Sequence, residues 1–209
     1  MKYYLLLILF WVAGYSQIDL EKDTLHLQEA VVTNLKFKGT RSIRYSSICS
    51  HLESLTYYTE FVTLVDKLPP GMVKSVYFKF NNWNEKDTHT NYKFDDTRLE
   101  IVFYEADKNN KPGNKLTIEP IIVTVPKEQS GRMKFDLAKH NIISNGKIFV
   151  GLRRITKNKG KKEEFEVDGI CDDKKGRYIS YERKDVTSKW SVARSNKALK
   201  LELQVSILK

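Results

Sequence analysis

Hydrophobic and polar residues alternate along much of this chain, most regularly near its C-terminal end. Leu199, Leu201, Leu203, Val205 and Ile207 fall on one face of a predicted strand, and polar residues occupy the positions between them. Period-two alternation predicts a strand with one buried face and one solvent-exposed face. Such a strand is typical of an antiparallel sheet.

The same alternation predicts more strands earlier in the chain. Apolar positions share a face within the segments 59–65, 76–80, 99–103, 121–125, 133–137 and 148–152. Turn sequences separate them at 68–71, 109–113, 130–131 and 144–146. One short helical turn is expected at 136–141, with Asp136 as its cap. Many short strands with turns between them predict an all-β fold, an antiparallel β-sandwich that is jelly-roll-like.

The N-terminus is typical of a targeting segment. Lys2 precedes an apolar run over 3–12, and small residues follow at 13, 14 and 16, which predicts a signal peptide over 1–16. The alternative is a retained anchor, but the run is short for a membrane span and a polar segment follows it. We therefore expect a secreted, periplasmic or outer-membrane-associated protein with no transmembrane segment after cleavage. Residues 17–50 form either an arm or an edge strand, and 51–209 form the sandwich domain.

The chain has two cysteines, Cys49 and Cys171. Export would permit a disulfide between them. Two buried free thiols are the alternative, since spacing alone does not show whether the geometry allows a bridge.

The net charge of +10 points to anionic partners. For an exported protein these are lipopolysaccharide, acidic glycans and membrane surfaces, and we expect no nucleic-acid partner. The densest basic run, at 157–162, has no aromatic residue among its lysines and is typical of a solvated loop.

Motifs for catalysis are missing from the sequence. It has four histidines, none at metal-ligand spacing, and it has no HExxH, Cys-x-x-Cys, G-x-S-x-G or phosphate-binding motif. We therefore predict no catalytic residue, no metal and no cofactor.

Aromatic residues in polar segments are the better candidates for a binding site. Trp83 lies between Asn82 and Asn84 after a predicted strand, and Tyr92 follows nearby. Such rings can stack on sugars while amide and guanidinium groups donate hydrogen bonds, for which Arg153 and Arg154 are candidates. The alternative is that these rings cap the ends of the core with their polar tips in water.

Five segments together resemble a known group of proteins. They are LPPGMVKSVYFKF, RLEIVFYEADKNNKPGNKL, IIVTV, GRMKFDLAKHNI and GKIFVGLRRI, preceded by LHLQEAVVT. In order and turn sequence they resemble the secreted β-sandwich region of uncharacterised Bacteroidota (flavobacterial) envelope proteins, often found with a carboxypeptidase regulatory-like module. This chain lacks that module and has Arg153 and Arg154 where the group has an acidic and an aromatic residue. The resemblance implies a fold and a location and brings no catalytic residue.

These observations predict an exported, non-enzymatic envelope protein with a binding or adhesion role. Its expected partner is a glycan or lipopolysaccharide. The first alternative is a structural protein that assembles with an envelope protein through an exposed edge strand. The second is an enzyme similar to glycoside hydrolases, with paired carboxylates in a cleft.

Overall fold

The computed structural model describes residues 35–46, 50–54, 59–81, 96–127, 129–155, 166–171, 178–193 and 197–209. Of residues 50–54, 81, 166 and 171 it describes the backbone alone. The chain divides into two compact units, Met1–Leu35 and Lys36–Lys209, and the second unit contains all the described strands.

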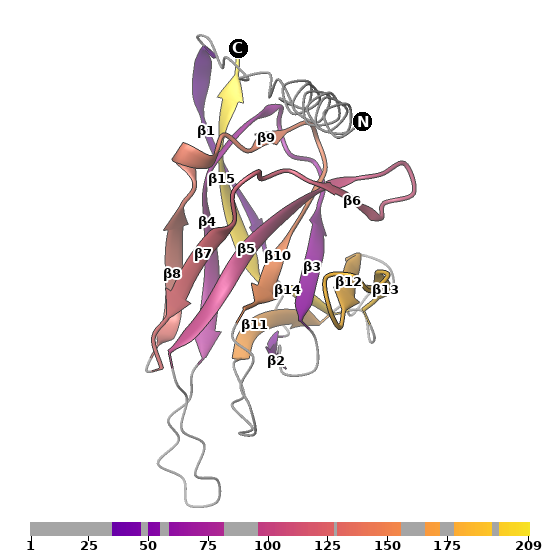
Figure 1. The fold of residues 1–209 in the computed structure, drawn as a ribbon. Coiled ribbons are helices and arrows are strands. Elements are labelled where there is room, and N and C mark those ends of the chain that lie inside the picture. Colours follow the sequence, from indigo (N-terminus) through magenta and orange to yellow (C-terminus); the bar gives the residue numbers. More distant parts are fainter. Residues whose placement is uncertain are drawn as a thin grey trace, which may run out of the picture. The chain divides into compact units, whose positions relative to one another are not determined.

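Two antiparallel sheets make up this second unit (Figure 1). Over the described residues the first sheet has eight strands: β1 (Phe37–Tyr45), β2 (Ser50–Ser54), β4 (Gly71–Asn81), β8 (Ser130–Asp136), β9 (Ile143–Ser144), β11 (Glu166–Cys171), β14 (Lys197–Leu199) and β15 (Leu201–Leu208). The second has seven: β3 (Glu60–Val65), β5 (Thr97–Ala106), β6 (Pro112–Lys115), β7 (Ile121–Val125), β10 (Ile148–Arg154), β12 (Ser180–Arg183) and β13 (Ser191–Val192). The prediction of an all-β antiparallel sandwich is confirmed.

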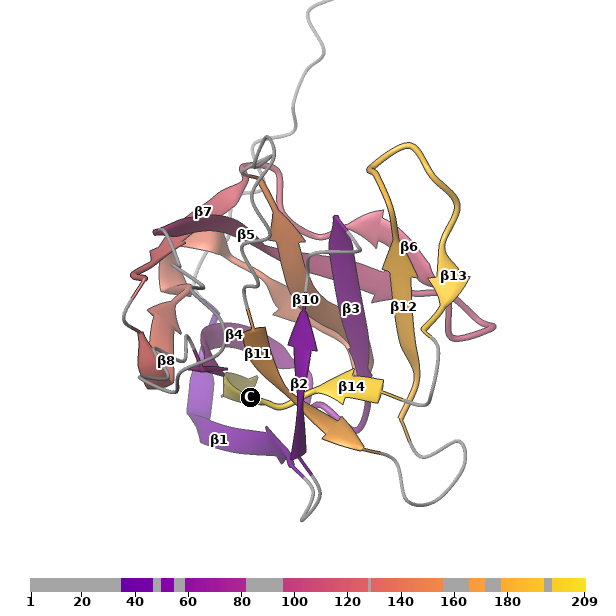
Figure 2. The same ribbon diagram turned by 90° about the horizontal axis from the view of Figure 1, so that it is seen from below.

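The chain passes back and forth between the sheets. β3 and β4 belong to different sheets, as do β4 and β5, and the same holds for β10, β11 and β12 in turn. Figure 2 shows β12, β3 and β10 side by side in the second sheet, with β11 and β14 of the first sheet beside them. This alternation gives the sandwich its jelly-roll-like connectivity.

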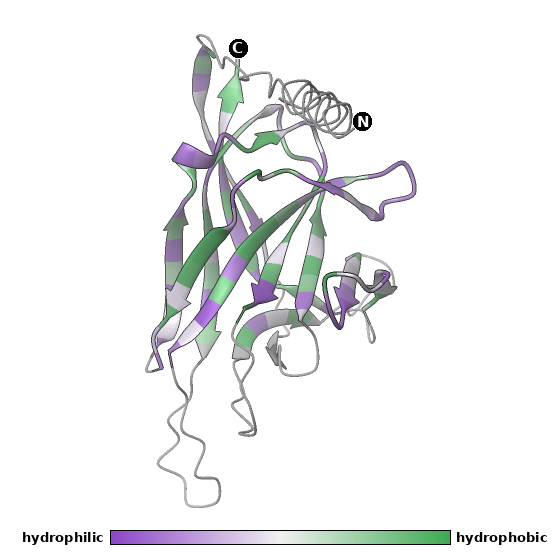
Figure 3. Ribbon diagram, in the orientation of Figure 1, coloured by the Kyte–Doolittle hydropathy of each residue, from purple (hydrophilic) through white to green (hydrophobic). Residues whose placement is uncertain are grey.

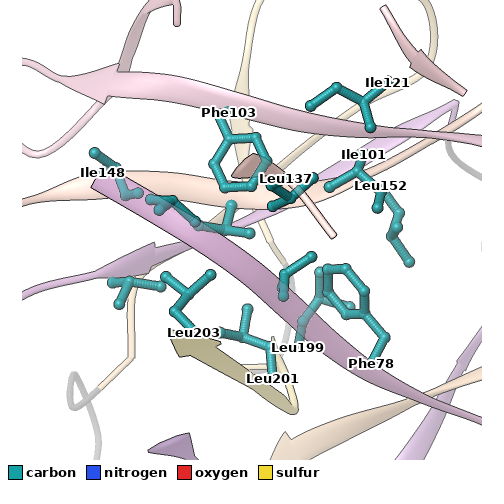
Figure 4. Close-up of a cluster of buried hydrophobic side chains, with 14 of the residues drawn as sticks. Phe78, Ile101, Phe103, Ile121, Leu137, Ile148, Leu152, Leu199, Leu201 and Leu203 are labelled. Atoms are coloured by element: carbon teal, nitrogen blue, oxygen red, sulfur yellow. The ribbon is translucent and has the colours of Figure 1, made fainter. Parts of the chain in front are cut away.

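The main core fills the space between the sheets. Its residues are the apolar positions that alternate along the strands, among them Phe78 of β4, Phe103 of β5, Leu152 of β10 and Leu203 of β15. Figure 4 shows these side chains pointing toward one another, and Figure 3 shows hydrophobic colour on the strands and hydrophilic colour on the turn between β5 and β6. Burial of such side chains is the main driving force for folding.

The strand predicted over 199–207 is wrong in its extent. The strand breaks at Lys200. Before the break, β14 ends at Leu199 and pairs with β11; after it, β15 begins at Leu201 and lies between β1 and β4. The face predicted to be exposed to solvent is also partly buried, since Glu202 and Ser206 are buried. Both are covered because β15 is an interior strand with side chains from its neighbours over it.

Two local predictions have mixed outcomes. The helical turn is present as a short 3₁₀ helix at Ala138–His140, but the prediction that Asp136 caps it is wrong, because the N-cap residue is Leu137. The Asp136 carboxylate nonetheless accepts a hydrogen bond from the Ala138 amide at 3.0 Å. Ser130 and Gly131, predicted as a turn, instead begin strand β8 opposite Asn81 and Phe80. Gly131 adopts φ 102°, a positive value that glycine tolerates, so a backbone conformation common in turns occurs here inside a strand.

Strand β1 lies within the segment 17–50 that the sequence left as an arm or an edge strand. It pairs with β15 from Phe37 opposite Leu208 to Tyr45 opposite Leu201, and it is the terminal strand in the order of the first sheet. Among the described residues, no helix is long and apolar enough to cross a bilayer.

We predict a disulfide between Cys49 and Cys171, although Cys49 itself lies outside the described residues. β2 and β11 are antiparallel with Ser50 opposite Ile170; Cys49 precedes Ser50 and Cys171 follows Ile170. Partners advance in opposite directions along an antiparallel pair, so this register favours the bridge. The non-reduced protein should migrate faster in a denaturing gel than the reduced protein. Two thiols titratable in denaturant without reductant would contradict the bridge.

Candidate binding groove on the outer face of the first sheet

A row of polar side chains crosses the outer face of the first sheet. The register places Arg44 of β1 opposite Glu202 of β15, Glu202 opposite Tyr77 of β4, and Tyr77 opposite Lys134 of β8. These positions alternate with the core residues on the same strands, so all four project from the outer face. Four strands that are distant in sequence thus contribute to one surface.

Glu202 is the centre of this row. Only 8% of the residue is exposed, and its carboxylate accepts hydrogen bonds from Ser42 Oγ at 2.5 Å and Arg44 Nε at 2.8 Å. Burial by itself would raise the pKa of the Glu202 carboxyl, but these hydrogen bonds and the charges of Arg132 and Arg44 outweigh it and lower the pKa. Glu202 is therefore a fixed negative charge that orients the cations around it.

Arg132 reaches the same carboxylate from the other side. It lies on β8, its guanidinium lies over the Tyr77 ring at 4.1 Å from the centroid, and its Nη2 is 2.6 Å from Glu202 Oε2. The ring and the carboxylate together fix the plane of the guanidinium. About half of the Arg132 side chain, 47%, is still exposed, so the group remains accessible to a ligand.

A second buried carboxylate holds two more cations nearby. Asp168 of β11 is 2% exposed, and its Oδ2 lies 3.0 Å from Lys79 Nζ and 3.8 Å from Lys200 Nζ. Lys79 and Arg132 are themselves cross-strand neighbours on β4 and β8. The two clusters are therefore contiguous.

Most of these side chains line a groove of about 410 Å³, which we call the outer groove. Its charged lining residues are Arg44, Lys79, Arg132, Lys200 and Glu202, and its aromatic lining residues are Tyr45, Tyr77 and Phe78. Counting Asp168 beneath Lys79 and Lys200, four cations face two carboxylates, which leaves a surplus of two positive charges. The volume falls in the range of small-ligand pockets.

None of the residues that the sequence singled out is among the described residues that line the outer groove. Asn82, Trp83, Asn84 and Tyr92 are outside the described residues. Arg153 and Arg154 end strand β10 in the second sheet and do not line the outer groove; Arg153 pairs with Glu100, and Arg154 Nε is buried without a hydrogen-bond partner among the described residues.

The outer face of the second sheet carries a separate charged network. Glu60, which is fully buried, accepts hydrogen bonds from Tyr104 Oη at 2.5 Å and from Arg183 Nε at 2.8 Å. The Arg183 guanidinium lies 4.3 Å from the centre of the Trp190 ring, and Trp190 packs edge-on against Tyr104. Trp190 therefore belongs to a second cluster of packed side chains.

Sequence reasoning missed the outer groove because its residues are ordinary in their local context. Alternation assigns Glu202 to the solvent-exposed face of its strand, where a carboxylate is ordinary. Its burial depends on Ser42, Arg44 and Arg132, which are far away in the sequence. The one available signal was the number of basic residues on the polar faces of predicted strands.

The sequence matches no protein-family model and no curated protein. The fold is similar to that of the clostridial cysteine protease Cwp84 after propeptide cleavage, with 11% identity and a TM-score of 0.52 over 80% of this chain and 40% of that chain. A structure of the cysteine protease and lectin-like domains of Cwp84, a surface layer associated protein of Clostridium difficile, gives 12% identity and a TM-score of 0.49 over 82% of this chain and 37% of that chain. This chain thus spans about 40% of the first of these structures, and at this identity the similarity concerns the fold alone.

Proposed function

We propose that the protein is an exported, non-enzymatic binding protein of the cell envelope, and that it binds an anionic glycan in the outer groove. The observation that carries this proposal is the surplus of positive charge in a concave site of about 410 Å³. The groups that supply this charge are held in place by the buried carboxylates of Glu202 and Asp168.

Preorganisation makes these cations suited to binding. Arg44 and Arg132 are held by one carboxylate, so they lose less conformational freedom on meeting a ligand than free surface arginines do. Their planar guanidinium groups can donate pairs of hydrogen bonds to a carboxylate or phosphate. A sugar acid or a sugar phosphate presents such groups.

The composition of the groove favours a glycan among anions. Tyr77 contributes a partly exposed ring beside the cations, and Lys79 and Lys200 add donors suited to sugar hydroxyls. The expected export of the chain would place it with lipopolysaccharide and acidic glycans. These two sources share the chemistry of a negatively charged sugar and are separated in the test below.

The test is a titration of the purified protein with three probes: polygalacturonate, lipopolysaccharide and the neutral polymer dextran. We expect one or both anionic probes to bind, more weakly as salt rises, and dextran not to bind. Arg132→Ala should lower the affinity at least about tenfold, because a charge-assisted hydrogen bond is worth about 1.5–3 kcal/mol.

Lys108→Ala is the matched control, since it removes one positive charge from the exposed turn between β5 and β6, away from the groove. It should leave the affinity within about twofold, because it removes only a screened, distant charge. Absence of binding to both anionic probes would overturn the proposal and favour a structural role beside an envelope protein. Equal losses in the two variants would show that binding depends on net charge and not on this groove.

A further inference from the structure

A second groove lies on the other side of the end of strand β1. It also has a volume of about 410 Å³ and is lined by the stretch from Arg41 to Ser46 together with Asp66, Lys67 and Tyr178. We call it the edge groove. Arg44, Tyr45 and Ser46 line both grooves, so the two meet at the end of this strand.

The edge groove repeats the chemistry of the outer groove. It has three cations, Arg41, Arg44 and Lys67, against one carboxylate, Asp66. That carboxylate is engaged by Tyr45 Oη, which also accepts a hydrogen bond from the Asp66 amide at 2.9 Å. The surplus of charge is again positive.

Two aromatic rings complete this second groove. The rings of Tyr45 and Tyr178 lie 5.8 Å apart at an angle of 59°, and both are partly exposed. Tyr45 is fixed by its two hydrogen bonds with Asp66. Rigid aromatic faces beside cations are suited to pack against sugar rings while their charged substituents meet guanidinium groups.

We infer that the two grooves form one continuous site for an internal stretch of a linear anionic polysaccharide, which passes around the end of β1 and places successive charged sugars in each groove. This inference rests on the proposed function. A single charged sugar could occupy one groove at a time, whereas a chain can occupy both, and the second contact then forms at a high effective concentration.

The experiment is a titration with oligogalacturonates of increasing length. For the unaltered protein the affinity should rise by about tenfold or more from the shortest oligomer and then level off once both grooves are filled. The shortest oligomer is expected in the outer groove, so Tyr178→Ala should lower the affinity for long oligomers several-fold and leave that for the shortest unchanged. Arg41→Ala, an exposed change on β1, should do the same and guards against misfolding of the tyrosine variant.

Arg132→Ala separates this inference from the proposed function. It should weaken the binding of short and long oligomers alike, because the outer groove contacts both. If short and long oligomers bind equally per site, or if neither Tyr178→Ala nor Arg41→Ala affects long oligomers, the continuous site is overturned while the outer groove stands. If no oligomer of any length binds and lipopolysaccharide does not bind either, the proposed function itself fails.

Discussion

Replacing Arg183 with methionine should lower the free energy of unfolding by about 3–5 kcal/mol. The guanidinium donates to both Glu60 and Tyr104, with Nη2 at 2.6 Å from Glu60 Oε2 and 2.9 Å from Tyr104 Oη. The Glu60 side chain is fully buried and that of Arg183 is 12% exposed, so water cannot replace the lost partner. Methionine keeps an unbranched apolar stem but loses the guanidinium that lies over the Trp190 ring, so most of the loss comes from the buried carboxylate left without its partner. Urea unfolding measures it.

A double variant tests this explanation. Glu60→Gln combined with Arg183→Met removes both charges and keeps an amide oxygen as the acceptor for Tyr104. Removing both members of a buried pair costs much less than removing one, so the double variant should be more stable than Arg183→Met. Arg44→Met is the exposed control and should change stability by less than about 1 kcal/mol. A loss of that small size for Arg183→Met would contradict the network.

The dependence of the free energy of unfolding on alkaline pH gives a second readout of the same network. Burial, followed by the hydrogen bond to Glu60, raises the pKa of Tyr104 well above its ordinary value. A group whose pKa is raised in the folded state contributes stability below its unfolded pKa, here about 10, and loses that contribution as the pH rises further. Stability should therefore decline above about pH 10, and Tyr104→Phe should reduce the slope. If the free energy of unfolding fell equally steeply with pH in Tyr104→Phe, the ionisation of the Tyr104 phenol would not be linked to unfolding.

The sequence predicts the main core well because alternation reports a local property. Phe61, Val65, Ile101 and Leu152 share faces in the pattern and lie together between the sheets. Alternation does not report what covers the opposite face. Val62 and Leu64 occupy predicted second faces and are nonetheless buried, because Tyr104, Phe149, Tyr181 and Trp190 pack over them in a second cluster.

The candidate site is harder to predict for the same reason. A search for unusual residues in polar loops leads to Trp83, whereas the outer groove is built from common charged residues on regular strands. Arg44, Arg132 and Glu202 come together only because β1, β8 and β15 are arranged about β4 in one sheet. Strand order is not encoded in local periodicity, so neither is this surface.

Replacing Gly151 with alanine should be the most damaging small change in the second sheet, with a loss of about 3 kcal/mol or more in the free energy of unfolding. Gly151 sits in β10 between Val62 of β3 and Val102 of β5. An added Cβ would lie 2.0 Å from the Phe61 carbonyl oxygen and 2.7 Å from the Val62 Cα, both backbone atoms that cannot rotate away.

Gly113→Ala is the matched control for Gly151→Ala. At this position in β6 the new Cβ would meet the Glu105 carbonyl oxygen at 3.5 Å, an ordinary contact. The change should therefore be neutral or slightly stabilising, because alanine restricts the unfolded chain more than glycine does. Since both variants add one methyl group to a strand of the same sheet, the difference between them isolates the close approach of β10 to β3. Similar stabilities for the two variants would mean that β10 and β3 can separate at little cost, and the tight pairing that places Glu60 opposite Arg153 would not be a requirement of the fold.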